Sequence, residues 1–340
     1  MKITMEHGSG GRATGELIKE IFEKSFDSDV LSEMEDSAVV PGAGRLAVTT
    51  DSFVVTPLEY PGGDIGRLCV CGTVNDLLMR GAVPMYLTCG FILQEGADVD
   101  TLKRVVRSMA ATAKEAGIKI VAGDTKVIEG GTSAAEEAGM FINTAGVGFV
   151  PDSADVSSSK CAAGDAVIVS GNLGDHHAAI LSCRMEIENT IKSDNAPLNG
   201  MVSALMDSGA NVHAMRDITR GGLATVLKEL AEASGVRIEI DEEKIPVDSQ
   251  VQGFCGLLGL DPLYMGNEGK MAVIVDTADA ERALAAIRKS PYGEDAVLIG
   301  RVTEGETGGT GRKGSLILNT AVGGHRILDI LQGEGLPRIC

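Results

Sequence analysis

The sequence has no tryptophan and few other aromatic residues, with seven phenylalanines and four tyrosines among 340 residues. It also lacks an excess of positive charge, since 30 lysines and arginines stand against 48 aspartates and glutamates, giving a net charge of −18. Nucleic-acid binding needs clustered cations for the phosphates and aromatic faces for the bases. The composition therefore excludes a general nucleic-acid-binding protein. It is compatible with small phosphate-bearing ligands, which backbone amides and divalent cations also bind.

Long apolar runs are absent as well. No stretch reaches the roughly 18 apolar residues of a membrane span, and the N-terminus has no apolar segment typical of a signal peptide. We therefore expect neither membrane insertion nor export. The seven cysteines are odd in number and widely spaced, which is typical of a protein from a reducing, cytoplasmic environment.

The length exceeds the roughly 100 to 200 residues of one domain and predicts two. Helix and strand patterns alternate through both halves, which favours two α/β or α+β domains. Residues 152–164 are rich in Ser, Asp and Ala without periodicity, so we place the joint there. The predicted organisation is a flexible Gly-rich nucleotide loop over 1–13, an N-terminal domain over 14–155, a C-terminal α/β domain over 156–331 and a mobile tail over 332–340.

Hydrophobic periodicity predicts the main elements of both halves. In the first half these are a helix near 17–22, a strand pair over 46–50 and 53–55 interrupted at 51–52, helices at 65–80 and 99–116, and strands at 85–93, 118–122 and 140–150. In the second half they are helices at 222–234 and 278–289, and strands at 166–170, 236–240, 271–275, 296–302 and 315–318.

A glycine-rich stretch lies close to the N-terminus. Three glycines in four positions allow consecutive backbone amides to face a phosphate. The stretch has neither the Lys-Ser/Thr pair nor the preceding strand of common nucleotide motifs, so a flexible arm is the alternative. The candidate phosphate-binding residues are Gly8, Ser9, Gly10 and Gly11.

Four aspartates interrupt or follow apolar segments: Asp36, Asp51, Asp76 and Asp124. An unpaired buried carboxylate is costly, so such residues usually have a partner or a cation. Three or four aspartates that converge with phosphate oxygens provide the hard oxygen ligands that Mg²⁺ prefers. The alternative for each of them is a helix or turn cap.

Two motifs of the second half also carry candidate chemistry. In the first, Asp217 or Thr219 could cap the helix that follows, or the flanking arginines and glycines could approach an anionic ligand. In the second, Glu268 precedes a predicted strand and is either a solvated turn residue or a general base.

The histidines and cysteines separate into structural and chemical candidates. His176, His177 and His213 have no metal-ligand spacing and are expected in the core or on the surface. Cys69-x-Cys71 on a helix points its thiols apart, so both are expected to pack. Cys340 ends a tail containing glycine and proline, where an exposed thiol is an oxidation liability. Chemistry on this thiol explains it better than an incidental position.

Together these motifs resemble those of the HypE family of hydrogenase-maturation proteins, in the same order and over essentially the whole chain. The aspartate motifs are shared with the wider superfamily of aminoimidazole ribonucleotide synthetase, selenophosphate synthetase and thiamine-monophosphate kinase. The Pro-Arg-x-Cys terminus distinguishes the HypE family, and the first glycine-rich loop lacks the reactive residue of selenophosphate synthetases. The matching segments are 8–11, 50–52, 74–76, 122–126, 217–222, 267–269 and 337–340.

The resemblance implies a two-domain aminoimidazole ribonucleotide synthetase-like fold, with an N-terminal domain that binds ATP and strands that form a barrel across a homodimer. A partner carbamoyltransferase, HypF, carbamoylates the C-terminal cysteine. The enzyme then uses ATP to dehydrate the thiocarboxamide to a thiocyanate. The cyanide passes to iron on a HypC–HypD scaffold complex and becomes a ligand of the [NiFe]-hydrogenase.

On this resemblance ATP and Mg²⁺ are the cofactors. Cys340 carries the substrate, Glu268 is the base, and Lys126 is a charge partner for phosphate or for the imidate oxygen. Two rivals stay open: a small-molecule kinase or synthetase of the same superfamily, and a non-enzymatic scaffold that carries metal or cyanide. The predicted Mg²⁺ ligands are Asp51, Asp76, Asp124 and Asp36, and the predicted nucleotide contacts are Gly8, Ser9, Gly10, Gly11, Asp51, Asn75, Asp76 and Asp124.

Overall fold

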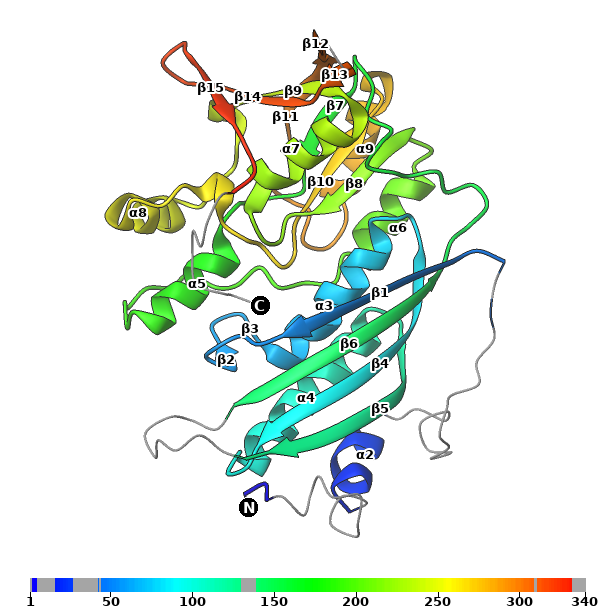
Figure 1. Ribbon diagram of the computed structural model, residues 1–340, viewed down its shortest axis with the longest axis vertical. Helices are drawn as coiled ribbons and strands as arrows, with labels where there is room; N and C mark the ends of the chain where they lie inside the picture. The colour runs from blue at the N-terminus through cyan, green and yellow to red at the C-terminus, as the bar shows by residue number, and fades with distance from the viewer. Residues whose placement is uncertain are drawn as a thin grey trace.

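The computed structural model describes residues 2–4, 16–26, 42, 44–129, 139–308 and 311–331. It consists of two mixed α/β halves, one built on a four-stranded sheet and the other on a seven-stranded sheet (Figure 1). This agrees with the predicted two-domain fold. The predictions for Gly8 to Gly11, for Asp36 and for the tail with Cys340 fall outside the described residues.

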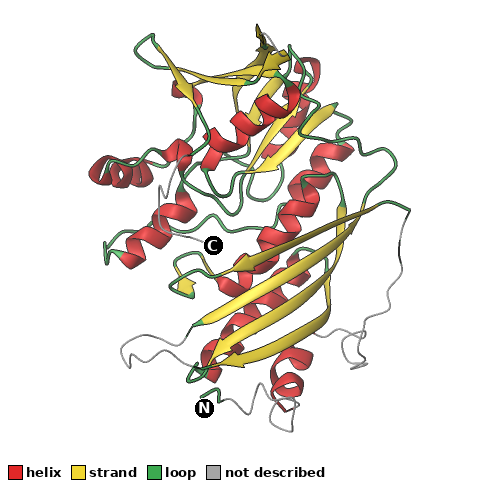
Figure 2. Ribbon diagram, viewed as in Figure 1, coloured by secondary structure: helices red, strands yellow, loops and turns green. Residues whose placement is uncertain are grey.

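The first sheet has the strand order β1-β6-β4-β5, in which β4 and β5 are parallel and the other pairs antiparallel. Helix α4 connects the parallel pair, as a crossover between parallel strands requires. Helices α3 and α4 lie on one face of this sheet, and the other face carries no helix among the described elements (Figure 2). The elements of this half are η2 Ile18–Glu23, α2 Lys24–Phe26, β1 Leu46–Phe53, β2 Glu59–Tyr60, β3 Gly63–Asp64, α3 Ile65–Leu78, β4 Val83–Gln94, α4 Val99–Glu115, β5 Lys119–Ile128 and β6 Met140–Phe149.

Helix α3 is buried on nearly all sides because it lies between the first sheet and the second half. It begins after Asp64, whose carboxylate accepts the backbone N–H groups of Gly66 and Arg67 at 2.7 and 2.9 Å. Helix α4 buries one face only, as its amphipathic sequence predicts. Gly117 follows it with φ +68°, the left-handed conformation that glycine commonly adopts just after a helix.

The second sheet has the order β15-β14-β9-β11-β7-β10-β8. Its central strands β7 and β10 are buried at every position, which explains their uninterrupted apolar sequences. The elements of this half are β7 Ala166–Val169, α5 Asp175–Arg184, α6 Asn199–Asp207, β8 Val212–Asp217, α7 Gly222–Ser234, β9 Val236–Asp241, η4 Glu242–Lys244, α8 Ser249–Leu258, η5 Pro262–Tyr264, β10 Met271–Val275, η6 Thr277–Asp279, α9 Ala280–Arg288, β11 Val297–Glu304, β12 Glu306–Gly308, β13 Gly311–Lys313, β14 Ser315–Asn319 and β15 His325–Leu328.

One expectation for the elements is wrong. The predicted strand pair near the start is one continuous strand, β1, and Asp51 lies inside it. A carboxylate can stay in a half-buried edge strand because only its side chain must find a polar environment, while the backbone still pairs with β6. The predicted helix 278–289 is confirmed as α9, which the 3₁₀ turn η6 precedes. Sequence periodicity also missed α5, α6, α8 and β8.

Asn75 joins the two halves. Its Nδ2 donates to the carbonyl oxygens of Ala196 at 3.1 Å and Glu268 at 3.4 Å, and its Oδ1 accepts the N–H of Leu198 at 2.9 Å. The side chain is buried, and the carbonyl oxygen of Glu268 also accepts the N–H of Ala196 at 3.3 Å. A single residue of α3 thus contributes three hydrogen bonds to the contact with the segments around Ala196 and Glu268.

No helix in the part of the chain that the structure describes combines the length and the apolar character needed to cross a membrane.

We expect Asn75→Ala to lower the free energy of unfolding by about 3 kcal/mol, because buried backbone groups that lose a partner cost about 1–3 kcal/mol each. Urea denaturation followed by circular dichroism measures the loss. Asn172→Ala is the matched control, since Asn172 makes one long contact to Asp295 at 3.4 Å near the surface. Equal stabilities of the two variants would contradict the role given to Asn75.

Candidate active site

A cavity of about 160 Å³ lies where the two halves meet. Strand β1 and helix α3 contribute one side, and the end of β8 with the loop before β10 contributes the other. Each half supplies two carboxylates. The lining residues are Thr50, Asp51, Gly72, Asp76, Asp217, Thr219, Arg220 and Glu268.

The first half brings Asp51 and Asp76 together across β1 and α3. Gly72 allows this close approach, because a Cβ there would lie 2.9 Å from the ring of Phe53 and 3.6 Å from Asp51 Oδ2. Asp76 accepts a hydrogen bond from Thr49 Oγ1 at 2.8 Å. Neither aspartate caps a helix, so the structural alternative considered for them does not hold.

The second half contributes Asp217 from the end of β8. Helix α7 begins after Gly221, which has φ +81° and provides no side-chain cap. The expectation that Asp217 or Thr219 caps this helix is therefore wrong. Both residues line the cavity instead, together with Arg220.

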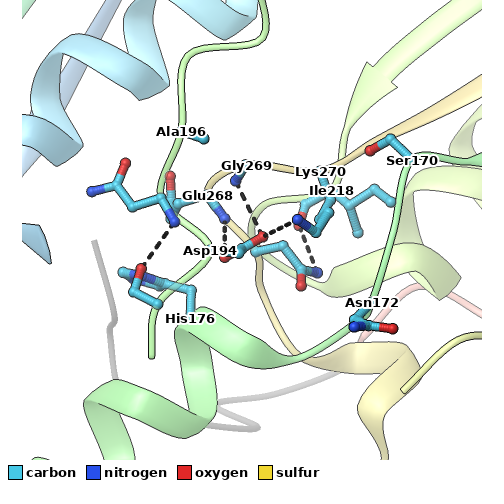
Figure 3. Close-up of polar contacts among 12 residues, drawn as sticks. Ser170, Asn172, His176, Asp194, Ala196, Ile218, Glu268, Gly269 and Lys270 are labelled. Atoms are coloured by element: carbon cyan, nitrogen blue, oxygen red, sulfur yellow. Dashed lines mark hydrogen bonds and ion pairs between the residues drawn. The ribbon is translucent and has the colours of Figure 1, made fainter. Parts of the chain in front are cut away.

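Glu268 is buried with 4% of its surface exposed, which excludes the solvated turn that the sequence left open. The loop around it is tightly held. Asn267 Oδ1 accepts the N–H of Gly174 at 2.8 Å, and the amides of Glu268 and Gly269 donate to Asp194 at 3.1 and 3.2 Å (Figure 3). Gly269 must be glycine, because a Cβ would lie 2.0 Å from the carbonyl oxygen of Asp194.

Burial raises the pKa of all four cavity carboxyl groups above their ordinary values. Neighbouring carboxylates raise the pKa further: Asp76 acts on Asp217, and Asp194 and Asp217 act on Glu268. Arg220 opposes this effect at Asp51 and Glu268. The site is thus short of positive charge and suited to a cation.

Among the described residues, no three acidic, histidine or cysteine side chains are grouped closely enough to hold a metal ion by themselves. This agrees with the behaviour of Mg²⁺, which proteins usually bind through one or two carboxylates while water and substrate phosphates complete the octahedron. The carboxylates of the cavity fit a cation that arrives together with a phosphate ligand.

Asp124 and Lys126 lie elsewhere. Both are on β5 and pair with each other at 2.6 Å, and Lys126 lowers the pKa of Asp124. The register aligns Asp51 with Gly123 through β6 and β4, so Asp124 points to the opposite face of the sheet. Within one chain the structure does not bring Asp124 or Lys126 to Asp51 and Asp76, because side chains of adjacent strand positions face opposite sides.

Asn75 likewise has a role that the sequence did not indicate. Its amide holds backbone groups of the second half, whereas it was expected to contact the nucleotide. The sequence also placed Asp217 among possible helix caps and not among the predicted metal ligands. The available signal was the short alternating segment before it, which forms β8 and carries Asp217 at its end, as α3 carries Asp76 near its end.

His176, His177, Cys69 and Cys71 behave as predicted. His176 and His177 are buried, and His176 Nδ1 lies 2.8 Å from Ser193 Oγ. Burial lowers the pKa of His177 to about 3, so this imidazole is neutral. Cys69 and Cys71 are fully buried packing residues.

Comparisons with known proteins agree with this architecture. Residues 34–150 match the family described as AIR synthase related protein, N-terminal domain, and residues 162–312 match the corresponding C-terminal domain. The chain is 46% identical to the carbamoyl dehydratase HypE of Rhizobium leguminosarum bv. viciae, covering 100% of this chain and 95% of that protein.

Two solved structures are also similar. A hydrogenase maturation protein HypE in complex with ATP has a TM-score of 0.92 and 46% identity, covering 99% of both chains. A HypE–HypF complex contains a chain with a TM-score of 0.78 and 46% identity, covering 93% of this chain and 99% of that one.

The raised pKa of Asp217, to about 7, makes stability depend on pH. In the unfolded chain Asp217 loses its proton near pH 4, whereas in the folded protein it keeps the proton up to about pH 7. The free energy of unfolding therefore falls as pH rises from about 4 to about 7. Without metal or nucleotide, we expect the stability advantage of Asp217→Asn over the wild type to increase by about 2 kcal/mol between pH 5.5 and 7, since one pKa unit corresponds to about 1.4 kcal/mol.

Urea denaturation between pH 5.5 and 8 in the presence of a chelator tests this. The advantage of Asp217→Asn should grow with pH and level off above about pH 7. Asp124→Asn is the control. It should be less stable than the wild type throughout this pH range, because Lys126 stabilises the ionised form of Asp124 and lowers its pKa. A constant difference across the range would refute the role of Asp217 as a buried, destabilising carboxylate.

Proposed function

The chain belongs to the HypE family of carbamoyl dehydratases, and we propose that its dehydration reaction takes place at the cavity between the two halves. The protein is an enzyme of hydrogenase maturation that converts an S-carbamoylated cysteine to a thiocyanate with ATP. The observation that carries the assignment of the site is the convergence of four carboxylates, two from each half, on one small cavity beside Arg220, with Asp217 and Glu268 buried and Asp51 and Asp76 half-buried.

The carboxylates support binding of Mg²⁺ with the phosphates of ATP. One or two of Asp51, Asp76 and Asp217 would hold the cation together with the phosphates, because each has a pKa raised by burial and each gains from a positive charge. When bound, Mg²⁺ neutralises negative charge on the phosphoryl group that is transferred. The predicted phosphate contacts of Gly8 to Gly11 and the predicted ligand Asp36 stay predictions.

The reaction needs ATP because an amide oxygen is a poor leaving group. The oxygen of the thiocarboxamide attacks the γ-phosphorus of ATP, and ADP leaves. The nitrogen then loses its protons, and the C–O bond breaks to release phosphate and form the nitrile. Thiocarboxamide and ATP thus give thiocyanate, ADP and phosphate, and the thiol of Cys340 carries the carbon throughout.

Glu268 is the proposed base for the nitrogen protons. Its carboxyl group is buried, and burial together with Asp194 raises its pKa well above the ordinary value. A carboxylate with a raised pKa is a stronger base and suits proton transfer near neutral pH. Its position on the rigid loop before β10 also limits the directions in which it can point.

The open face of the first sheet supports the predicted homodimer. Leu46 and Val48 of β1 expose 51% and 69% of their surfaces on this face, an arrangement that favours a covered apolar surface. Asp124 and Lys126 lie on the same face. We infer that any contribution of Lys126 to the reaction is made through the dimer, since it faces away from the cavity of its own chain.

The proposed partners are the carbamoyltransferase HypF and the HypC–HypD iron scaffold. A similar protein is known in a HypE–HypF complex, which supports the first of them. The second rests on the family resemblance alone, and the cytoplasmic location rests on the cysteine pattern of the sequence. Cys340 is the group that these partners would share.

Intact mass of the C-terminal peptide tests the function. After incubation with the carbamoyltransferase, carbamoyl phosphate, ATP and Mg²⁺, we expect a carbamoyl adduct that loses one water. Glu268→Gln should be carbamoylated and lose water at least about 100-fold more slowly, the usual contribution of a general base.

Glu304→Gln, an exposed residue of β11, is the matched control and should behave like the wild type. An unmodified thiol in the wild type would favour the small-molecule kinase or the scaffold. Full dehydration by Glu268→Gln would show that another group is the base.

We expect Val48→Asp to convert the dimer to a monomer, because a carboxylate on the apolar face would be desolvated on association. Light scattering coupled to size-exclusion chromatography measures the mass. Ile327→Asp is the control, since Ile327 is exposed to 77% on β15 of the other half. A dimer that survives Val48→Asp and dissociates with Ile327→Asp would place the interface elsewhere.

A further inference from the structure

Residues Ser193 to Ala196, which we call the strap, run without helix or strand between the two halves. Ser193 N–H donates to the carbonyl oxygen of Pro61 at 2.8 Å, and Arg67 Nε donates to the carbonyl oxygen of Asn195 at 2.8 Å. The strap is therefore fixed to the first half at both ends. Such dense hydrogen bonding of an irregular segment indicates that its geometry matters.

Asp194 is the strap residue that turns toward the second half. Its side chain is 2% exposed, and its two oxygens accept the N–H groups of Glu268 at 3.1 Å and Gly269 at 3.2 Å. Lys270 Nζ lies 4.0 Å from the same carboxylate. Figure 3 shows the carboxylate between these three consecutive residues.

The two amides lie on either side of the Cα atom of Glu268. The first belongs to the peptide plane before that atom and the second to the plane after it, so holding both planes fixes φ and ψ of Glu268. These two angles set the direction of the Cα–Cβ bond. Asn75 Nδ2 holds the carbonyl oxygen of the second plane from the side of α3 at 3.4 Å.

We propose that Asp194 is a positioning residue for the dehydration, which aims the Glu268 carboxylate into the cavity by holding the peptide planes on both sides of it. The proposal rests on the proposed function of Glu268. Asp194 is not among the residues that line the cavity, so in this proposal it acts through Glu268.

A carboxylate is the group that this position needs. Each of its oxygens can accept an amide N–H, and hydrogen bonds to a charged acceptor are about twice as strong as neutral ones. An asparagine of the same shape keeps one acceptor oxygen and presents an NH₂ group to the other amide. Asp194→Asn therefore releases one of the two peptide planes without emptying the site.

The test is a single-turnover measurement on the full chain after carbamoylation, with Mg²⁺ and ATP added and loss of water followed by intact mass. We expect Asp194→Asn to lower the rate constant at saturating ATP roughly 10- to 100-fold, as misplacement of a reacting group by up to about 1 Å does. The ATP concentration that gives half of the maximal rate should not change.

A structural defect alone would lower the amplitude of the reaction, which reports the folded fraction, and leave the rate constant unchanged. Asp165→Asn is the matched control. Asp165 is also buried and accepts a backbone N–H, that of Ala162 at 2.8 Å, but lies outside the cavity. It should lower stability and keep the wild-type rate constant.

Ser193→Ala decides the question if Asp194→Asn does not fold. Ser193 Oγ accepts the N–H of Asn195 at 3.1 Å and lies 2.8 Å from His176 Nδ1, so its removal loosens the strap without leaving a charge unpaired. Ser193→Ala should lower the same rate constant by about 3- to 10-fold, the loss expected when neutral hydrogen bonds are removed. A wild-type rate constant in the folded variants, or a loss of ATP affinity alone, overturns the proposal. Absence of water loss in the wild type would instead overturn the proposed function.

Discussion

Four carboxylates gathered at one joint, two of them buried and two half-buried, are the constraint on which the rest of the structure depends. Each of them would ionise readily in water, and burial makes the ionised form costly. A cation bound with phosphate removes this cost, so ligand binding and stability are coupled at this site. Because the carboxylates come from both halves, the same binding event also tightens the contact between them.

The two halves are joined at the site by hydrogen bonds between side chains and backbone atoms. Asn75 satisfies backbone groups of the second half, and the strap carries hydrogen bonds from the first half to Asp194. Contacts of this kind have fixed lengths and directions, whereas exposed ion pairs between long side chains hold their partners loosely. The joint can therefore set the position of Glu268 while the charges beside it change with the state of the ligand.

Local sequence patterns predicted the features that depend on residues close together in the chain. The apolar runs of β7 and β10 indicated buried strands, and Asp51, Asp76 and Glu268 were recognised because charge at the end of an apolar segment is costly. Asp217 was taken for a possible helix cap because the choice of Gly221 as cap depends on backbone conformation. Asp124 looked equivalent to Asp51, and only the register of four strands shows that the two face opposite sides.

Because Asp51 and Asp124 face opposite sides of the first sheet, the proposed site residues fall into two separate groups. One chain gathers Asp51, Asp76, Asp217 and Glu268 on the helix-covered side of its first sheet. Its Asp124 and Lys126 lie on the open side with the exposed side chains of β1. A second copy that covers the open side would place this ion pair at the interface, where removal from water strengthens its field. Metal and base functions then belong to one chain, and the part given to Lys126 belongs to the assembly.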